Sequence, residues 1–110
     1  MTYVLYDPVN YRMQIKGHAN VSQDGRDPVC AGCSALAWAL VEASTEQVEY
    51  HARLYIDEKK PVIDVCCRPE PDAEKACLYM FEVIMGGLLL ISEAHPENVR
   101  IRIGGPEDGA

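Results

Sequence analysis

The longest apolar segment of the sequence, residues 71–93, most constrains what this chain can fold into. Its apolar side chains recur at helical spacing and cover most of the surface that a helix of this length would have. Pro71 and the acidic residues after it suit a helix start, and Pro96 follows the predicted end. Such a helix must be covered by other elements, so we expect it at the centre of the fold. Gly86-Gly87 lowers helix propensity and predicts close packing against another backbone there.

A second helix is predicted over residues 28–47, where an apolar stripe and several alanines favour helix formation. Asp27 before it is a good N-cap, because its carboxylate can accept hydrogen bonds from the N–H groups of the first turn. Pro28 suits the first helical position, where a missing N–H costs nothing. Trp38 lies off the stripe, which predicts either a place at the edge of the core or a contact with another subunit.

The other apolar segments are short, and several alternate apolar with polar residues as half-buried strands do. The clearest case is residues 11–17, where Met13 and Ile15 alternate with polar side chains. Turn-forming residues between segments predict two hairpins. The predicted strands are residues 2–7, 11–17, 48–56, 61–67 and 97–103.

These elements follow one another in the order β-β-α-β-β-α-β, which indicates an α+β protein. We therefore expect a single domain over residues 1–110, a cysteine-protease domain if the interpretation below holds, with two helices packed on one face of a mixed sheet. A length of 110 residues suits one core, and a hydrophobic share of 48% predicts a packed globule rather than disorder.

The chain is acidic, with 17 Asp and Glu residues against 10 Lys and Arg residues and a formal net charge of −7. This charge argues against a phosphate-binding surface, so we expect no direct contact with nucleic acid. It fits a basic protein or peptide as partner, although a solvated acidic surface without a partner has the same composition. No apolar run looks long enough to cross a bilayer, so we expect no membrane association.

Five cysteines form an odd set, and no signal peptide precedes them in this sequence. Disulfides are rare in the reducing cytoplasm and common in secreted proteins. We therefore expect a reduced, cytoplasmic protein. The cysteines are Cys30, Cys33, Cys66, Cys67 and Cys77.

Cys30 falls in the first turn of the predicted helix, where the positive end of the helix dipole favours a thiolate over a thiol. A neighbouring imidazole can take the thiol proton or pair with the thiolate. His18 is the candidate, because it follows a strand whose connection to the helix folds back on itself. Gly17 and residues 20–26 are predicted to form a mobile cover that closes over a bound chain.

The spacing of His18 and Cys30 leaves other interpretations open. A cysteine near a helix start is often a small buried hydrophobe. Cys30 and Cys33 also form a Cys-x-x-Cys pair, which a thiol–disulfide protein or a structural metal site would use. The flanking residues do not fit thioredoxins, and Cys66-Cys67 does not supply the second pair of a zinc ribbon. A non-catalytic binding module is the fourth interpretation.

A set of short motifs runs through residues 17–36 and returns near the C-terminus: Gly17-His18-Ala19, Gly25, Asp27, Val29-Cys30-Ala31, Ser34-Ala35-Leu36, Gly87-Leu88, Ile91, Pro96 and Val99 to Ile103. In this order they resemble the ribosomal-processing cysteine proteases of bacteria. The sequence departs from the family pattern at Pro28, Cys33 and His95, where the family usually has an aliphatic, a small or aliphatic, and an aromatic residue.

The resemblance implies a cysteine endopeptidase in which Cys30 is the nucleophile and His18 the general base and acid. Gly17, Asp27 and Ser34 are the supporting positions. Asp27 could orient His18 as well as cap the helix, and Ser34 could bond near Cys30 or within its own helix. The oxyanion would be held by unpaired backbone N–H groups near Cys30. We expect no cofactor and no metal.

In the family that this chain resembles, the protease removes a short N-terminal extension, with paired phenylalanines before the cut, from a large-subunit ribosomal protein. Related chains occur in prophages beside capsid genes, so a capsid or other phage protein is the alternative substrate. The resemblance also implies a homodimer. The tyrosines available to hold the phenylalanines are Tyr3, Tyr6, Tyr11, Tyr50 and Tyr55, of which we expect at least three to pack against the helices instead.

Overall fold

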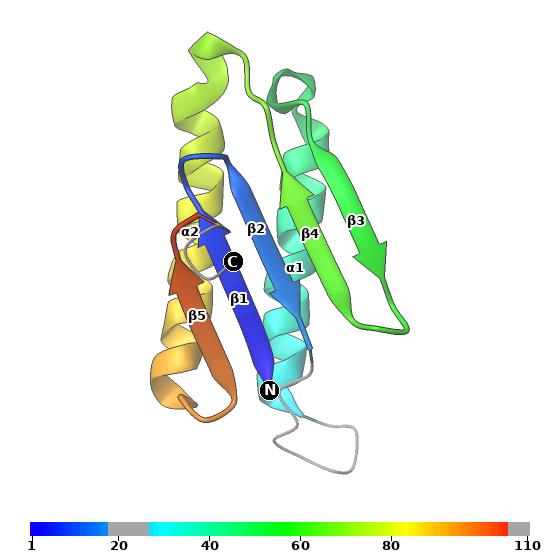
Figure 1. Cartoon of the computed structure of the whole chain (residues 1–110), viewed down its shortest axis with the longest axis vertical. Helices are drawn as coiled ribbons and strands as arrows, with labels where there is room; N and C mark the ends of the chain where they lie inside the picture. Colours follow the sequence, from blue (N-terminus) through cyan, green and yellow to red (C-terminus); the bar gives the residue numbers. More distant parts are fainter. Residues whose placement is uncertain (18–26, 106–110) are drawn as a thin grey trace.

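The structure is a computed structural model that describes residues 1–17 and 27–105. Its elements in chain order are β1 (Thr2–Asp7), β2 (Arg12–Lys16), α1 (Pro28–Glu46), the 3-10 turn η1 (Val48–Tyr50), β3 (Arg53–Asp57), β4 (Val62–Cys66), the 3-10 turn η2 (Pro71–Ala73), α2 (Glu74–Ala94) and β5 (Val99–Ile103). The strands form a mixed sheet in the order β3-β4-β2-β1-β5, and both helices lie on one face of it (Figure 1). The predicted α+β fold is therefore confirmed.

Alternation along the strands separates a buried face of the sheet from an open one. β1 pairs antiparallel with β2 and parallel with β5, while β4 pairs antiparallel with β2 and β3. Val4, Tyr6, Met13 and Ile15 are buried beneath the helices. Tyr3 points to the other face, where it is half exposed. Successive residues of one strand thus serve two different surfaces.

α2 contributes Phe81 and Leu88 to the core, both fully buried, and packs alongside α1. A Cβ added at Gly87 would lie 2.9 Å from both terminal methyl carbons of Leu36 on α1, which is closer than packed atoms allow. The two helices approach each other at this point because Gly87 has no side chain. The close packing predicted at Gly86-Gly87 is found at Gly87, against a side chain rather than a backbone.

The largest departure from the predicted boundaries lies at residues 48–52, which the sequence suggested as a strand. Residues 48–50 form η1 instead, and His51 then adopts the left-handed conformation with φ 46°. Tyr50 is buried, and its carbonyl accepts the N–H of Arg68 at 2.9 Å. Packing of Tyr50 into the core turns the chain here, so β3 begins only at Arg53.

Candidate active site

Cys30 is the third residue of α1, and the start of the helix sets its position. Asp27 is the N-cap, and its Oδ1 accepts the N–H of Val29 at 2.9 Å and the N–H of Cys30 at 3.1 Å. Pro28 occupies the first helical position. The predicted cap is confirmed, and it holds Cys30 in the first turn, at the positive end of the helix dipole.

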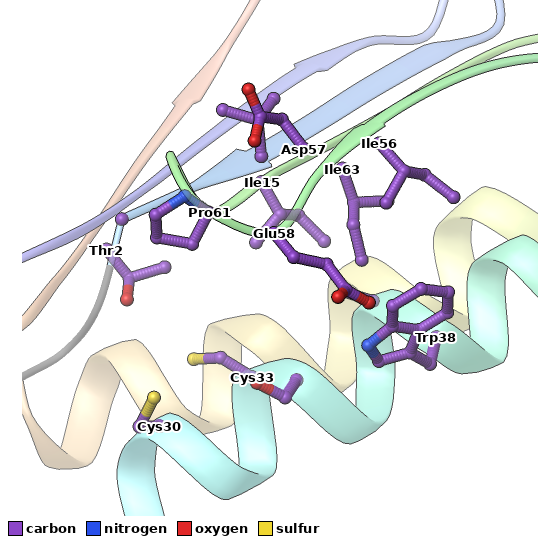
Figure 2. A pocket seen from close by; sticks show the side chains of 14 residues that line it. Thr2, Ile15, Cys30, Cys33, Trp38, Ile56, Asp57, Glu58, Pro61 and Ile63 are labelled. Atoms are coloured by element: carbon purple, nitrogen blue, oxygen red, sulfur yellow. The ribbon is translucent and has the colours of Figure 1, made fainter.

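Cys30 lines a cavity of about 260 Å³ between α1 and the sheet (Figure 2). Ile15 and Ile63 form part of its wall on the sheet side, and Trp38 forms part of its wall on the helix side. Figure 2 shows Cys30 and Thr2 toward one end and Trp38 toward the other. The thiol therefore stands at one end of a largely apolar space that can hold a side chain of a peptide.

The turn between β3 and β4 also borders the cavity, with Pro61 toward Thr2 and Glu58 toward Trp38 (Figure 2). Oδ1 of Asp57 accepts the N–H of Lys59 at 3.0 Å and that of Lys60 at 3.2 Å, which shapes the turn. Figure 2 shows the carboxylate of Glu58 beside the indole of Trp38. The Trp38 end of the cavity thus combines an aromatic ring with a negative charge, a combination that suits a cationic group.

Gly17 lines the same cavity as Cys30, and its backbone conformation is one that glycine tolerates. Its φ is +91°, in the left-handed region, and its N–H donates to the carbonyl of Pro61 at 2.8 Å. A Cβ at this position would collide with the carbonyl oxygen of Met1. The last residue before His18 is therefore held at the cavity by the turn before β4 and by the N-terminus, and no larger residue fits.

Cys33 lines the cavity too, but its thiol has a different environment from that of Cys30. Cys33 is only 4% exposed, whereas Cys30 is half buried. Burial raises the pKa of the Cys33 thiol, and the nearby Cys30 and Asp27 raise this pKa further. Cys33 therefore stays protonated at neutral pH, which disfavours it as an attacking thiolate.

The structure corrects one prediction about the oxyanion. The sequence suggested that unpaired N–H groups near Cys30 would hold it, but the N–H groups of Val29 and Cys30 both donate to Asp27. The N–H of Ala31 donates to the Asp27 carbonyl at 2.9 Å. The first-turn amides are thus occupied by the cap, because a good N-cap residue satisfies the donors that an oxyanion would need.

Of the remaining predicted site residues, Ser34 lies in the described part of the chain and His18 does not. Ser34 is exposed and lines the cavity together with Cys30 and Gly17. His18 and residues 20–26 lie outside the described residues, so the pairing of His18 with Cys30 and the covering loop stay predictions.

The aromatic side chain at the cavity is one that sequence reasoning assigned elsewhere. Trp38 is 45% exposed and lines the cavity, so it belongs to the site. As expected, three of the five tyrosines pack into or against the core; they are Tyr6, Tyr11 and Tyr50. A tryptophan off the apolar stripe but on the same helix as Cys30 was the available signal.

The described residues can be compared with the metal-site and thiol–disulfide interpretations of the cysteines. There, no three His, Cys, Asp or Glu side chains gather as metal ligands would. All five cysteines lie in the described ranges, and no disulfide joins any two of them.

Solved structures share this fold over nearly its whole length. The ribosomal processing protease Prp of Staphylococcus aureus with a covalently linked product peptide has a TM-score of 0.80 at 21% identity, covering 94% of this chain and 99% of that one. The same protease with a substrate peptide has a TM-score of 0.74 at 20% identity, with the same coverage of 94% and 99%. A protein of Streptococcus mutans has a TM-score of 0.70 at 23% identity, covering 94% and 91%.

Comparison of sequences, unlike the likeness of fold, assigns the chain to a family. No curated protein matches the chain. The family described as cysteine protease Prp matches residues 6–100, a range that contains Gly17, Cys30 and the other residues of the cavity except Thr2. Because this match spans most of the sequence and both helices, the chain belongs to the cysteine protease Prp family.

Proposed function

We propose that this protein is a processing endopeptidase that removes a short N-terminal extension from a basic protein of the large ribosomal subunit. The observation that carries the proposal is the placement of Cys30 in the first turn of α1, beside a cavity of about 260 Å³. Family membership supplies the reaction class, that of a cysteine protease. The Staphylococcus aureus structures support the substrate, since that protein is a ribosomal processing protease seen with substrate and product peptides.

In the proposed reaction His18 takes the proton of the Cys30 thiol, and Sγ attacks the carbonyl carbon of the scissile peptide bond. His18 then gives the proton to the departing amine, so that the C–N bond breaks and a thioester remains on Cys30. A water molecule, deprotonated by His18, hydrolyses the thioester and restores the thiol.

The described part of the chain supports His18 as the base among the three histidines of the sequence. His51 lies 3.1 Å from a carboxylate oxygen of Glu70, and neither His51 nor His95 lines the cavity. Gly17, the residue that precedes His18, does line it. Its bond to the Pro61 carbonyl anchors the chain there.

The cavity also supports the proposed substrate chemistry. Its apolar walls suit an apolar side chain close to the cut, and the carboxylate of Glu58 at the far end suits a cation. The net charge of −7 should draw a basic peptide toward the enzyme, an attraction that salt weakens. A substrate with an apolar pair and basic residues would therefore use both properties.

We further propose that the protein forms a homodimer through α2 and acts in the cytoplasm. Tyr79, Val83 and Leu90 are 57%, 74% and 70% exposed and share one side of the helix with Gly86, where a Cβ would meet nothing within 4 Å. Contiguous apolar patches of this kind mark interaction surfaces. In a dimer, Val83→Glu should shift the mass measured by light scattering to that of a monomer.

The same helix also bears on the membrane question. Contrary to the sequence-based expectation, the segment Pro71–Ala94 is long and apolar enough to cross a membrane by length and composition alone, since an 18-residue stretch of it has a mean hydropathy of 1.6. Its other side, however, contributes Cys77, Phe81 and Leu88 to the core beneath the sheet. We therefore favour a second copy over lipid as the cover of the exposed stripe.

The test uses two peptides that differ only at the proposed apolar pair. One carries Phe-Phe followed by small and basic residues, and the other carries Gly-Ser in place of Phe-Phe. We expect the protein to cut only the first peptide and its apparent KM to rise with salt. His18→Ala should lower kcat by roughly 100-fold or more, the usual contribution of a general base.

Two results would count against the proposal. Equal cutting of both peptides would show that the site does not recognise the apolar pair. Cleavage of neither peptide, by a folded protein whose cysteines are reduced, would remove the ribosomal extension as substrate and make a capsid-type protein the next one to test.

A further inference from the structure

The open face of the sheet is basic, although the chain as a whole is acidic. A shallow groove of about 620 Å³ runs over β2, β1 and β5 on this face, away from both helices. Four of the ten Lys and Arg residues of the chain line it, and they are Arg12, Lys16, Arg100 and Arg102. The net charge of −7, on which the expectation of no nucleic-acid contact rested, therefore does not describe this side of the molecule.

An exposed aromatic ring lies in the middle of these cations. Tyr3 on β1 is 50% exposed. The strand register places Lys16 on β2 directly opposite Tyr3 and Arg100 on β5 directly opposite it on the other side. Since neighbouring strands lie about 4.8 Å apart, one positive charge flanks the ring on each side. Arg102 continues the positive row two residues further along β5.

Three of the four cations have no internal partner in the described structure. Arg12 forms an ion pair with Asp64 at 2.6 Å, and Gln14 donates to the same carboxylate at 3.0 Å. Among residues 1–17 and 27–105, no ion pair involves Lys16, Arg100 or Arg102. Asp57 on β3 lies in the same row of the sheet as Lys16, and it accepts the N–H groups of its own turn. This positive charge is thus available to a ligand.

We propose that this face binds a single-stranded nucleic acid, with a base stacked on Tyr3 and phosphates contacted by Lys16, Arg100 and Arg102. Charge complementarity requires an anionic ligand, and a ring between two cations favours one that alternates flat aromatic groups with phosphates. An acidic peptide would pair with the cations but would leave the ring without a role. Because the face lies on the opposite side of the sheet from Cys30, nucleic acid and peptide can be held together.

The test measures fluorescence anisotropy of a labelled mixed-sequence RNA of about 12 nucleotides, and of DNA of the same sequence, with the full-length protein. With three phosphate contacts we expect log K to fall against log salt with a slope of about −2. Arg100→Gln with Arg102→Gln should reduce the size of that slope by about 1.4. Tyr3→Leu should weaken binding at least about fivefold, whereas Tyr3→Phe should preserve it because stacking needs only the ring.

Matched controls locate the effect on this face. Lys75→Gln removes one positive charge from α2, on the other side of the sheet, and should leave binding unchanged. The Arg100/Arg102 variant should cut the Phe-Phe peptide as the wild type does, which shows that it is folded. The proposal is overturned if neither oligonucleotide binds at low salt, if the variants bind as the wild type does, or if a polyglutamate peptide binds equally well and ignores Tyr3→Leu.

Discussion

Two pairs of cysteines in this protein show how position decides what a thiol can do. Cys30 and Cys33 lie one turn apart at the start of α1, and both line the cavity. Cys67 and Cys77 lie in the core, where they are 1% and 0% exposed. Burial raises the pKa of both core thiols. Only Cys30 combines partial exposure, a helix start and a cavity, which is the environment that reactive cysteines require.

The strongest test of this difference between the two cysteine pairs is to remove one cysteine from each pair. Cys30→Ala should lower kcat for the Phe-Phe peptide by at least about 1,000-fold, because no other described thiol can replace the nucleophile. Cys77→Ala should leave kcat close to that of the wild type but lower the free energy of unfolding by about 1–2 kcal/mol. Peptide cleavage and urea unfolding of both variants measure this. Full activity of Cys30→Ala would refute its role as the nucleophile.

A second prediction concerns the backbone that leads to His18. Gly17→Ala should destabilise the protein by about 1–3 kcal/mol, because the left-handed φ of +91° and the Met1 carbonyl leave no room for a Cβ. It should also lower kcat/KM, by up to about 100-fold, since the chain beside the cavity must shift. Gly86→Ala is the matched control, because a Cβ there meets nothing within 4 Å. Equal stability of the two variants would contradict the strain argument.

The features of the active site that could be predicted from the sequence are local ones. An Asp-Pro pair before an apolar stripe predicts the cap, the first helical residue and hence the place of Cys30. The order of the elements was also readable, because alternation and helical spacing are short-range patterns. The family resemblance added what spacing alone left open, namely the assignment of Cys30 as the proposed nucleophile.

The parts that sequence reasoning missed depend on contacts between distant segments. Trp38 and Glu58 line the same cavity only because β3 pairs with β4 and this hairpin lies against α1. The bond from the Cys30 N–H to Asp27 is local, yet it was missed too. The sequence assigned the first-turn N–H groups both to the cap and to the oxyanion, and they cannot serve both. Residues 48–52 were misassigned because Tyr50, a residue type that favours strands, fills the core from a turn.

A third prediction uses pH to sharpen the contrast between the pairs. The pKa of the Cys67 and Cys77 thiols is higher in the folded than in the unfolded chain, where a thiol titrates near about 8.5. Above that pH the unfolded chain loses protons that the folded chain keeps. The contribution of these two thiols to the free energy of unfolding is therefore complete below about pH 8.5. It is lost as pH rises, by at most about 1.4 kcal/mol per pH unit for each thiol. Urea unfolding between pH 7 and pH 10 should show that the free energy of unfolding falls less steeply with pH in the double variant Cys67→Ala with Cys77→Ala than in the wild type. An unchanged pH dependence would contradict this.

The smallest expected effect comes from Cys33, and it separates the protease from the thiol–disulfide interpretation. Cys33→Ala should leave kcat/KM for the Phe-Phe peptide within about twofold of the wild type, because the Cys33 thiol is buried, protonated and needed by no step of the proposed reaction. A protein that worked through Cys30 and Cys33 together would instead lose its activity in this variant and would depend on added reductant. Assays of wild type and variant with and without a thiol reductant distinguish the two. Loss of cleavage by folded Cys33→Ala would make Cys33 a partner of Cys30 rather than a buried neighbour, and the two cysteines at the start of α1 would then work as one unit.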